Sequence, residues 1–278
     1  MKSNKDTLSV IIPSWNTADV TVKCVKTVNQ FLPEAKIVIV DNASSDDSVV
    51  KLRRLNYKNL KIIINSTNLG YAKACNIGAK NCQTDFVLFF NSDSEMLDDS
   101  LLKVIDYYQQ NPNMGIIGLK MLNPDLTIQP SAFPPQTILN AFKEFWLKQP
   151  TYSKYLPPGN QPAEVFAVSG GALLIKKKIL DQIGGWNEKY FFYYEDIDIC
   201  RQAHRFGYKV IYYPQTSVIH RHGLSGKSLA TGENQWKRLI PSSILYYGRF
   251  QHHLISIIIW SGQKVQKIKK TLFSTKHE

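Results

Sequence analysis

The sequence predicts an α/β protein with a Rossmann-like, mainly parallel sheet flanked by helices. Along the first half, short runs rich in Val and Ile alternate with segments whose apolar residues recur every three or four positions. Strands that alternate with helices in this way form parallel sheets covered on both faces. The second half has a mixed pattern of strands and helices, and a helical tail is expected at the C-terminal end. The 278 residues suffice for one large domain or two small ones.

Each element of the first half follows from its local pattern. In residues 17–32, Val20, Cys24 and Val28 recur at intervals of four, so they share one face of a helix that Thr17 is expected to cap. The strand at residues 36–41 is β-branched and apolar on both faces. Further strands are expected at residues 8–12, 61–65, 85–91 and 114–122, and further helices at residues 44–55, 70–81 and 98–111.

The second half begins with an irregular segment. Eight prolines interrupt residues 122–162, where one short helix is expected around Ile138–Leu147. Strand character returns at residues 163–177. The next helix should close at Gly184 or Gly185, because glycine adopts the left-handed conformation that ends helices. A helix over residues 195–207 and short strands at 208–214 and 217–220 complete this half.

Composition narrows the classes of function. The formal net charge of +12 favours an anionic partner, such as nucleic acid, an anionic membrane surface or a phosphorylated ligand. No nucleic-acid-binding module is recognisable, and the turn PSWNTAD lacks the Gly-x-Gly-x-x-Gly of an α/β dehydrogenase. The four scattered cysteines are interpreted as core residues of a reduced, cytoplasmic protein. The first residues lack the apolar core of a signal peptide, and the run Leu254–Trp260 is too short to span a bilayer.

Polar residues follow the first four predicted strands, at the edge where parallel sheets bind their ligands. They are Ser14–Asn16, Asp41–Asn42, Asn68 and Asn91–Asp93. A buried strand that ends in carboxylates requires a cation or hydrogen-bond donors. Hard oxygen ligands such as Asp93 and Glu95 suit Mg²⁺ or Mn²⁺, and His220 is a candidate third ligand. Taken singly, Asp93 also fits a helix cap, and His220 also fits a core histidine.

Seven segments together resemble the family 2 glycosyltransferases of the GT-A fold, and in particular their rhamnosyltransferase-like branch. They span roughly residues 7–226 and occur in this order: SVIIPSWN, VIVDNASSDDS, NLGYAKACNIGAK, FFNSDSEM, VSGGALLIKK, IGGWNEKYFFYYEDIDICRQAHRFGYKV and VIHRHGLS. Each segment alone is a weak signal, whereas seven in order are a strong one. The resemblance implies a reaction that moves a sugar from a nucleotide-diphosphate donor to a hydroxyl and inverts the anomeric carbon.

The resemblance implies a nucleotide pocket at the strand ends. Its expected residues are Pro13, Trp15, Asn16, Asp41, Asn68 and Gly70. Asp41 would accept a hydrogen bond from a pyrimidine N–H, and Gly70 would let the backbone approach the nucleotide.

The family's Asp-x-Asp motif is represented here by Asn91-Ser92-Asp93. Asn91 would bind near the ribose, and Asp93 would bind the divalent cation, Mn²⁺ or Mg²⁺. His220 matches the late histidine of the family's His-x-x-Gly-x-Ser pattern at residues 220–225 and would be a second protein ligand. Asn91 stands in place of the first Asp of the motif, so one negative charge is missing there. Glu95 would restore some of this charge or cap the next helix.

Single-displacement transfer needs one general base and no covalent nucleophile. The family's Glu-Asp pattern makes Asp196 the expected base, and its place near a helix N-terminus is expected to keep it ionised at neutral pH. Glu195 would orient the acceptor or be the alternative base. Gly170, Gly171 and Trp186 are expected at the acceptor site, whereas Phe191 and Phe192 are assigned to the core and Arg201 to an ion pair within its helix.

These expectations define a glycosyltransferase domain at residues 1–248, with a nucleotide-sugar-binding half at 7–121 and an acceptor half at 163–226. A basic amphipathic segment follows at residues 249–278, which suits a helix lying on an anionic membrane surface and also fits a packed C-terminal helix with a solvated basic end. The resemblance implies a peripheral position at the inner face of a bacterial membrane. The predicted reaction transfers rhamnose from dTDP-rhamnose to a lipid-diphosphate-linked or growing saccharide in surface polysaccharide synthesis (O-antigen or capsule). A UDP-hexose donor and a catalytically inactive scaffold are the alternatives.

Overall fold

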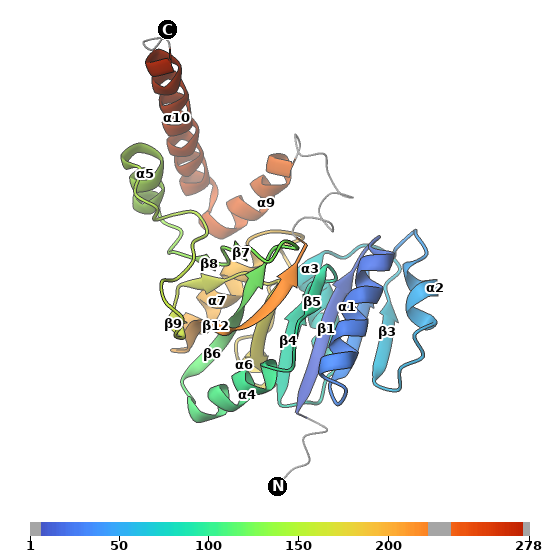
Figure 1. Ribbon diagram of the computed structural model, residues 1–278. Helices are drawn as coiled ribbons and strands as arrows, with labels where there is room; N and C mark the ends of the chain where they lie inside the picture. Colours follow the sequence, from blue (N-terminus) through green and yellow to red (C-terminus); the bar gives the residue numbers. More distant parts are fainter. Residues whose placement is uncertain (1–6, 222–234, 275–278) are drawn as a thin grey trace.

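The computed structural model describes residues 7–221 and 235–274, and a central sheet with helices on both faces dominates it (Figure 1). The first half contributes four parallel neighbours, β1 (Leu8–Ser14), β2 (Lys36–Asp41), β3 (Leu60–Ile64) and β4 (Phe86–Phe90). Its helices are α1 (Ala18–Phe31), α2 (Ser48–Arg53), α3 (Tyr71–Lys80) and α4 (Leu101–Gln110). The predicted α/β class is therefore confirmed.

The second half extends the same sheet with mixed strand directions. The strand order is β3-β2-β1-β4-β11-β6-β12-β5, in which β11 (Ala172–Lys176) runs antiparallel to both β4 and β6 (Met114–Leu122). β12 (Lys209–His220) is parallel to β6, and β5 (Ser94–Met96) pairs with the end of β12. This half also contains β7 (Ile128–Gln129), β8 (Ala132–Phe133), β9 (Ala163–Glu164), β10 (Ala167–Val168), α6 (Lys177–Gln182) and α7 (Glu195–Arg205).

Two apolar layers enclose the sheet, because successive residues of a strand point to opposite faces. In β4, Val87 and Phe89 join one layer, and Leu88 and Phe90 join the other. The first layer includes residues of α3, α6 and α7, and the second includes residues of α1, α2 and α4. All four cysteines are free and buried, which agrees with their interpretation as core residues.

The two short strands predicted at residues 208–214 and 217–220 form the single strand β12. It pairs with β6 up to Tyr213 and again from Ser217, with a shift of register between them. Pro214 lies in this interval, where the interrupted ladder tolerates a residue without an N–H. Since β12 runs in the same direction as β4, its last residue, His220, lies at the sheet edge where β4 ends.

Beyond the sheet, the described residues form the helices α5 (Ile138–Leu147), which was predicted, α9 (Gln235–Tyr247) and α10 (Arg249–Ser274). α5 packs along α10, and the two helices project away from the sheet (Figure 1). Gln266 Nε2 donates to the Phe145 carbonyl at 2.8 Å, and a Cβ at Gly262 would lie 2.6 Å from the same oxygen. In the described part of the chain, no helix is long and apolar enough to cross a membrane. The division at residue 248 stays a prediction.

Gly78 allows α3 to lie directly on β1, because a Cβ there would meet Ile11 Cγ2 at 2.4 Å. We expect Gly78→Ala to lower the free energy of unfolding by about 1–3 kcal/mol through this overlap, despite the better helix propensity of alanine. Urea denaturation measures the change. Lys80→Ala, at an exposed position of the same helix, is the control and should stay within about 0.5 kcal/mol of the wild type. A Gly78→Ala protein as stable as the control would contradict this packing.

Candidate active site

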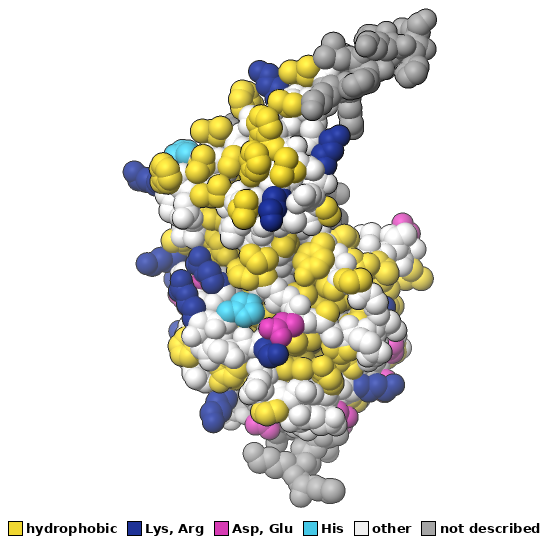
Figure 2. Space-filling model, turned by 90° about the vertical axis from the view of Figure 1, so that its left-hand side faces the viewer, with side chains coloured by type: hydrophobic (Ala, Val, Ile, Leu, Met, Phe, Trp, Pro, Cys, Tyr) yellow, Lys and Arg dark blue, Asp and Glu magenta, His cyan; other side chains and the backbone are white. Residues whose placement is uncertain are grey.

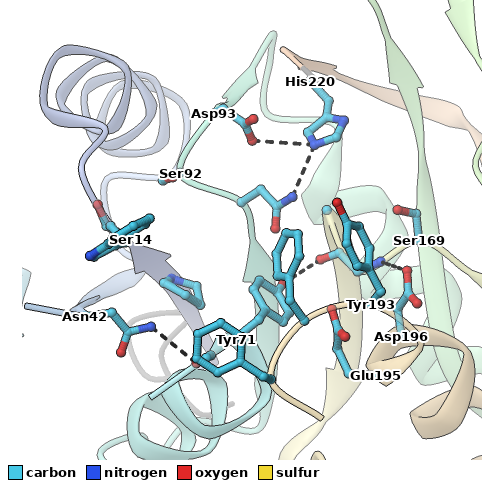
Figure 3. Close-up of a pocket in the computed structure, with 18 of the residues that line it drawn as sticks. Ser14, Asn42, Tyr71, Ser92, Asp93, Ser169, Tyr193, Glu195, Asp196 and His220 are labelled. Carbon is cyan, nitrogen blue, oxygen red and sulfur yellow. Dashed lines mark hydrogen bonds and ion pairs between the residues drawn. The ribbon is translucent and has the colours of Figure 1, made fainter. Parts of the chain in front are cut away.

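A cavity lies at the sheet edge where β1, β4 and β12 end, and Figure 3 shows the side chains around it. Polar residues that follow β1, β2, β3 and β4, namely Ser14, Asn42, Asn68 and Asn91, all line it. Among the residues predicted for the site, the cavity lining contains Pro13, Trp15, Asn68, Gly70, Asn91, Asp93, Gly170, Gly171, Glu195, Asp196 and His220. The structure thus brings both predicted halves of the site to one cavity.

Asp41 and Asn16 do not reach this cavity. The side chain of Asp41 is fully buried, and its Oδ1 accepts a hydrogen bond from the Ser44 N–H at 2.9 Å. Asn16 donates its N–H to Ser44 Oγ at 2.9 Å and accepts from the Ser45 N–H at 2.8 Å. Asn16 therefore fastens the loop after β1 to the loop after β2, and Asp41 holds Ser44 within that second loop. Asn42, the residue after Asp41, lines the cavity.

Trp186, which was expected at the acceptor site, does not line the cavity. Its side chain is 1% exposed and packs edge-on against Tyr71 and Phe89, with ring centroids 5.5 and 5.0 Å away. Asn76 holds it there, because its amide bonds both the N–H and the carbonyl of Trp186 at 2.9 and 2.8 Å. The ring is therefore part of the core and cannot stack on a sugar.

Phe191 and Phe192, which were assigned to the core, line the cavity instead. Phe191 is 47% exposed. The chain then turns into α7 through two residues with left-handed backbone, Tyr193 at φ 73° and Tyr194 at φ 67°. Such conformations are costly for aromatic residues and concentrate at functional sites. The periodicity of a run of five aromatic residues does not reveal such a turn.

Gly70 is required by a neighbouring segment of the protein itself. A Cβ at Gly70 would lie 2.5 Å from the carbonyl oxygen of Phe191, and φ at Gly70 is 84°. The Tyr71 N–H donates to that same carbonyl at 2.9 Å. Gly70 was predicted to let the backbone approach the nucleotide. In the structure it lets the start of α3 approach residues 191–194.

Asp93, His220 and Asn91 face one another at one end of the cavity (Figure 3). Asp93 Oδ1 lies 3.5 Å from His220 Nε2, and Asn91 Nδ2 lies 3.1 Å from the same nitrogen. Both Asp93 and His220 are buried. Glu95 points elsewhere and forms ion pairs with Lys23 and Arg221, each at 2.8 Å, so it neither adds charge to the cavity nor caps α4.

A hydrogen-bond network assigns the tautomer of His220. Gln129 Nε2 donates to Asn123 Oδ1 at 2.8 Å, so Gln129 Oε1 is the atom that faces His220 Nδ1 at 2.7 Å and accepts its proton. In the neutral ring, Nε2 then carries the lone pair and faces Asn91 and Asp93. This is the arrangement in which a neutral histidine binds a metal ion, with a second residue orienting the ring. Nothing in the sequence around Gln129 signals this positioning role.

Two protein ligands fit a divalent cation only if other groups complete its coordination. Within residues 7–221 and 235–274, no three His, Cys, Asp or Glu side chains gather around a common point. Mg²⁺ and Mn²⁺ commonly take one or two protein ligands and complete their coordination with water and substrate phosphates. Asp93 and His220 therefore suit a cation that arrives with a phosphorylated ligand. Gly223 and Ser225 of the His-x-x-Gly-x-Ser pattern, and the spare histidine at 222, lie outside the described residues.

Glu195 and Asp196 begin α7 and face the other part of the cavity (Figure 3). Asp196 accepts hydrogen bonds from the N–H groups of Gly170 at 3.2 Å and Ile197 at 2.9 Å. Among the described residues, no hydrogen-bond partner reaches Oε2 of Glu195, which is buried. Donors stabilise a carboxylate, so Asp196 is better suited than Glu195 to carry the negative charge.

Burial raises the pKa of both carboxyl groups. It raises the pKa of Glu195 to about 8, with the charge of Asp196 adding to the effect. For Asp196 burial also raises the pKa, while the positive charge of Lys154 and the two N–H donors oppose the rise. The sequence-based expectation considered only the helix N-terminus and missed this burial. The pair therefore favours one shared negative charge, carried by Asp196 beside a neutral Glu195.

Lys154 and Tyr71 are among the cavity residues that were not predicted. Lys154 lies in the proline-rich segment, where a single lysine has no distinguishing pattern, and its charge acts on both carboxyl groups. Tyr71 donates its hydroxyl to the Gly170 carbonyl at 2.9 Å and so ties α3 to the segment before β11.

Arg201 forms an ion pair with Asp198 within α7, as predicted.

Comparison with known proteins places the chain in a family. The profile described as Glycosyl transferase family 2 matches residues 9–184. N-acetylglucosaminyl-diphospho-decaprenol L-rhamnosyltransferase of Mycobacterium tuberculosis is 27% identical over 203 residues. The aligned region covers 66% of this chain and 66% of that relative.

Solved structures match the fold. GalNAc-T7 with UDP, GalNAc and Mn²⁺ has a TM-score of 0.62 at 17% identity, covering 79% of this chain and 44% of that one. The Pyrobaculum calidifontis mannosyltransferase PcManGT with GDP-Man and Mn²⁺ has a TM-score of 0.59 at 16% identity, covering 90% of this chain and 64% of that one. These likenesses support the predicted GT-A architecture. Because the family profile spans more than half of its length, the chain belongs to glycosyl transferase family 2.

Proposed function

We propose that this chain is an inverting glycosyltransferase that moves a sugar from a nucleotide-diphosphate donor to an acceptor hydroxyl. One observation carries the proposal: Asp93 and His220, which suit a cation, and the carboxyl pair Glu195 and Asp196 line the same cavity. The first pair suits the diphosphate of the donor. The second pair suits a hydroxyl that loses its proton as it attacks.

The donor is proposed to lie along the ends of β1, β2 and β4. Pro13 and Trp15 offer apolar surface there, and Asn42 and Asn91 offer hydrogen-bonding groups. Asn42 is held in place, since its Nδ2 donates to the Gly70 carbonyl at 3.2 Å and its Oδ1 accepts from Asn65 Nδ2 at 2.8 Å. A divalent cation bound by Asp93 and His220 would stabilise the charge that develops on the leaving diphosphate. Mn²⁺ accompanies the nucleotides in the two solved structures described above.

The acceptor is proposed to lie between Gly170, Phe191 and the start of α7. Asp196 is the proposed general base, because hydrogen-bond donors and Lys154 favour its charged form. Glu195, neutral at its raised pKa, would donate a hydrogen bond to an acceptor oxygen and orient it. Phe191 and Phe192 replace Trp186 as the aromatic surfaces offered to a sugar ring.

The finer proposal is a dTDP-rhamnose donor, with a UDP-hexose donor second. It is supported by the similarity to the rhamnosyltransferase from Mycobacterium tuberculosis described above, whose name also includes a diphospho-decaprenol. The proposed acceptor is accordingly a lipid-diphosphate-linked saccharide of bacterial surface polysaccharide synthesis, used at the inner face of the membrane. A second candidate function is an inactive scaffold that binds a nucleotide without transfer, which Asn91 favours because it replaces a carboxylate of the family motif.

The donor site is tested by thermal shift with UDP, dTDP, GDP and ADP, each with and without Mn²⁺. UDP or dTDP should raise the Tm only with Mn²⁺, through stabilisation of about 2.7 kcal/mol at a hundredfold excess over Kd. Asp93→Ala should abolish the shift, because one of the two cation ligands is lost. Asp99→Ala, which removes an exposed carboxylate nearby, should keep it. A shift that survives in Asp93→Ala, or no shift with any nucleotide, would count against the proposed site.

The base assignment is tested by Asp196→Asn and Glu195→Gln, with release of the nucleoside diphosphate as the measurement. Asp196→Asn should lower kcat by about 10²–10⁴-fold, because the base is lost, and should retain the nucleotide-dependent thermal shift. Glu195→Gln should cost less than about tenfold, since a neutral acid and an amide have the same shape and charge. Equal losses in both variants would reject the division of roles. Nucleotide binding by a wild-type protein that releases no product would favour the scaffold.

The proton on Glu195 makes stability depend on pH. Between the ordinary value of 4.5 and the raised pKa of about 8, the folded protein retains a proton that the unfolded chain has released. The free energy of unfolding of the wild type should therefore fall across this window relative to Glu195→Gln, and the difference should level off above it. Urea denaturation of both proteins at several pH values gives the difference, and a difference that is constant from pH 5 to pH 8 would show that Glu195 is ionised throughout.

A further inference from the structure

One side of α10 carries an apolar stripe that no part of the described protein covers. Phe250 is 79% exposed, Trp260 63%, Ile257 60% and Ile268 51%. From Ile257 onward these residues and Lys264 recur at intervals of three and four, so they follow one face of the helix. Single exposed apolar residues are ordinary, but a row of large ones along one helix marks an interaction surface.

The stripe is not the face by which α10 packs against its own protein. Gly262 and Gln266 contact Phe145 of α5, and the Ile258 carbonyl accepts from Trp146 Nε1 at 3.2 Å. Positions 258, 262 and 266 recur at intervals of four and form a second row. This row is offset from the first, so α5 braces α10 while leaving the apolar stripe uncovered.

Hydrophobic side chains also gather over the upper part of the face shown in Figure 2, where α5 and α10 lie, with Lys and Arg around them. On α5, Phe142 is 40% and Trp146 43% exposed, and their rings stack with centroids 6.1 Å apart. The braced pair of helices therefore presents aromatic surface from both members.

The positive charge of α10 favours an anionic partner. Residues 249–274 contain Arg249, Lys264, Lys267, Lys269 and Lys270 and no acidic residue. Lys264 lies within the stripe, and its Nζ is 5.0 Å from the centre of the Trp260 ring. A second copy packed on this stripe would bring lysines together with no carboxylate of α10 to pair with them. Anionic lipid headgroups pair with such lysines, while the apolar side chains enter the boundary between headgroups and acyl chains.

We propose that Phe250, Ile257, Trp260 and Ile268 of α10, together with Lys264, form a surface that binds an anionic lipid bilayer. The helix lies along the membrane and does not cross it. This surface is separate from the donor cavity and goes beyond the proposed transfer reaction. The stripe is the face of the protein that meets the bilayer, and α5 holds α10 out from the sheet.

The test uses the full chain and vesicles of phosphatidylcholine alone or mixed with phosphatidylglycerol, with cosedimentation as the measurement. The wild type should bind the mixed vesicles and bind more weakly at high salt. Ile257→Ser with Trp260→Ser should weaken binding by about tenfold or more, because two large apolar side chains are lost. Lys264→Glu should weaken binding to the mixed vesicles by about tenfold or more and leave weak binding to phosphatidylcholine alone unchanged.

Val50→Ser with Leu102→Ser is the matched control, because these exposed apolar residues lie on α2 and α4. It should bind as the wild type does. Binding of the Ile257→Ser/Trp260→Ser protein at wild-type strength, or no binding of the wild type to mixed vesicles, would overturn the proposal. So would light scattering that shows a wild-type dimer converted to a monomer by the double substitution, since the stripe would then join two copies. The nucleotide-dependent thermal shift of each variant reports separately on the donor cavity.

Discussion

The antiparallel pairing of β11 with β4 is the constraint on which the site depends. It sets Ala172 opposite Phe90, so the residues just before β11 meet those just after β4. There the Asn91 N–H donates to the Gly171 carbonyl at 3.0 Å. A Cβ at Gly171 would lie 3.4 Å from both Asn91 Nδ2 and His220 Nε2 and 2.9 Å from Met121 Cε. A glycine at this position therefore lets three segments that are distant in sequence approach one another at the cavity.

Electrostatics then divides the cavity into two functional ends. At one end His220, oriented by Gln129, faces the single carboxylate of Asp93. At the other end Glu195 is buried and its neighbour Asp196 is half-buried, and burial raises the pKa of both carboxyl groups, which disfavours two charges there. Hydrogen-bond donors reach Asp196, whereas none among the described residues reaches Oε2 of Glu195. The two neighbouring carboxyl groups thus differ in how well their charged forms are stabilised.

The aromatic residues before α7 form the structural link between the two ends. Trp186 packs in the core beside Tyr71, whose hydroxyl bonds Gly170, and the Phe191 carbonyl bonds the first N–H of α3. The left-handed turn at Tyr193 and Tyr194 aims Phe191 and Phe192 at the cavity and starts α7 with its carboxyl groups in place. The position of the carboxylates therefore depends on contacts with α3, well over a hundred residues earlier in the chain.

Local pattern by itself determined most of the longer strands and helices and most of the strand-end residues that line the cavity, because alternation, helical spacing and the polar ends of parallel strands are properties of neighbouring residues. It also determined the family through motifs such as Asn91-Ser92-Asp93 and Glu195-Asp196. Only the tertiary structure decided that Trp186 is buried while Phe191 is exposed, that Asp41 bonds Ser44, and that Lys154 and Gln129 act on the site. Exposure, hydrogen-bond partners and pKa depend on which distant segments pack together, and no window along the chain contains that information.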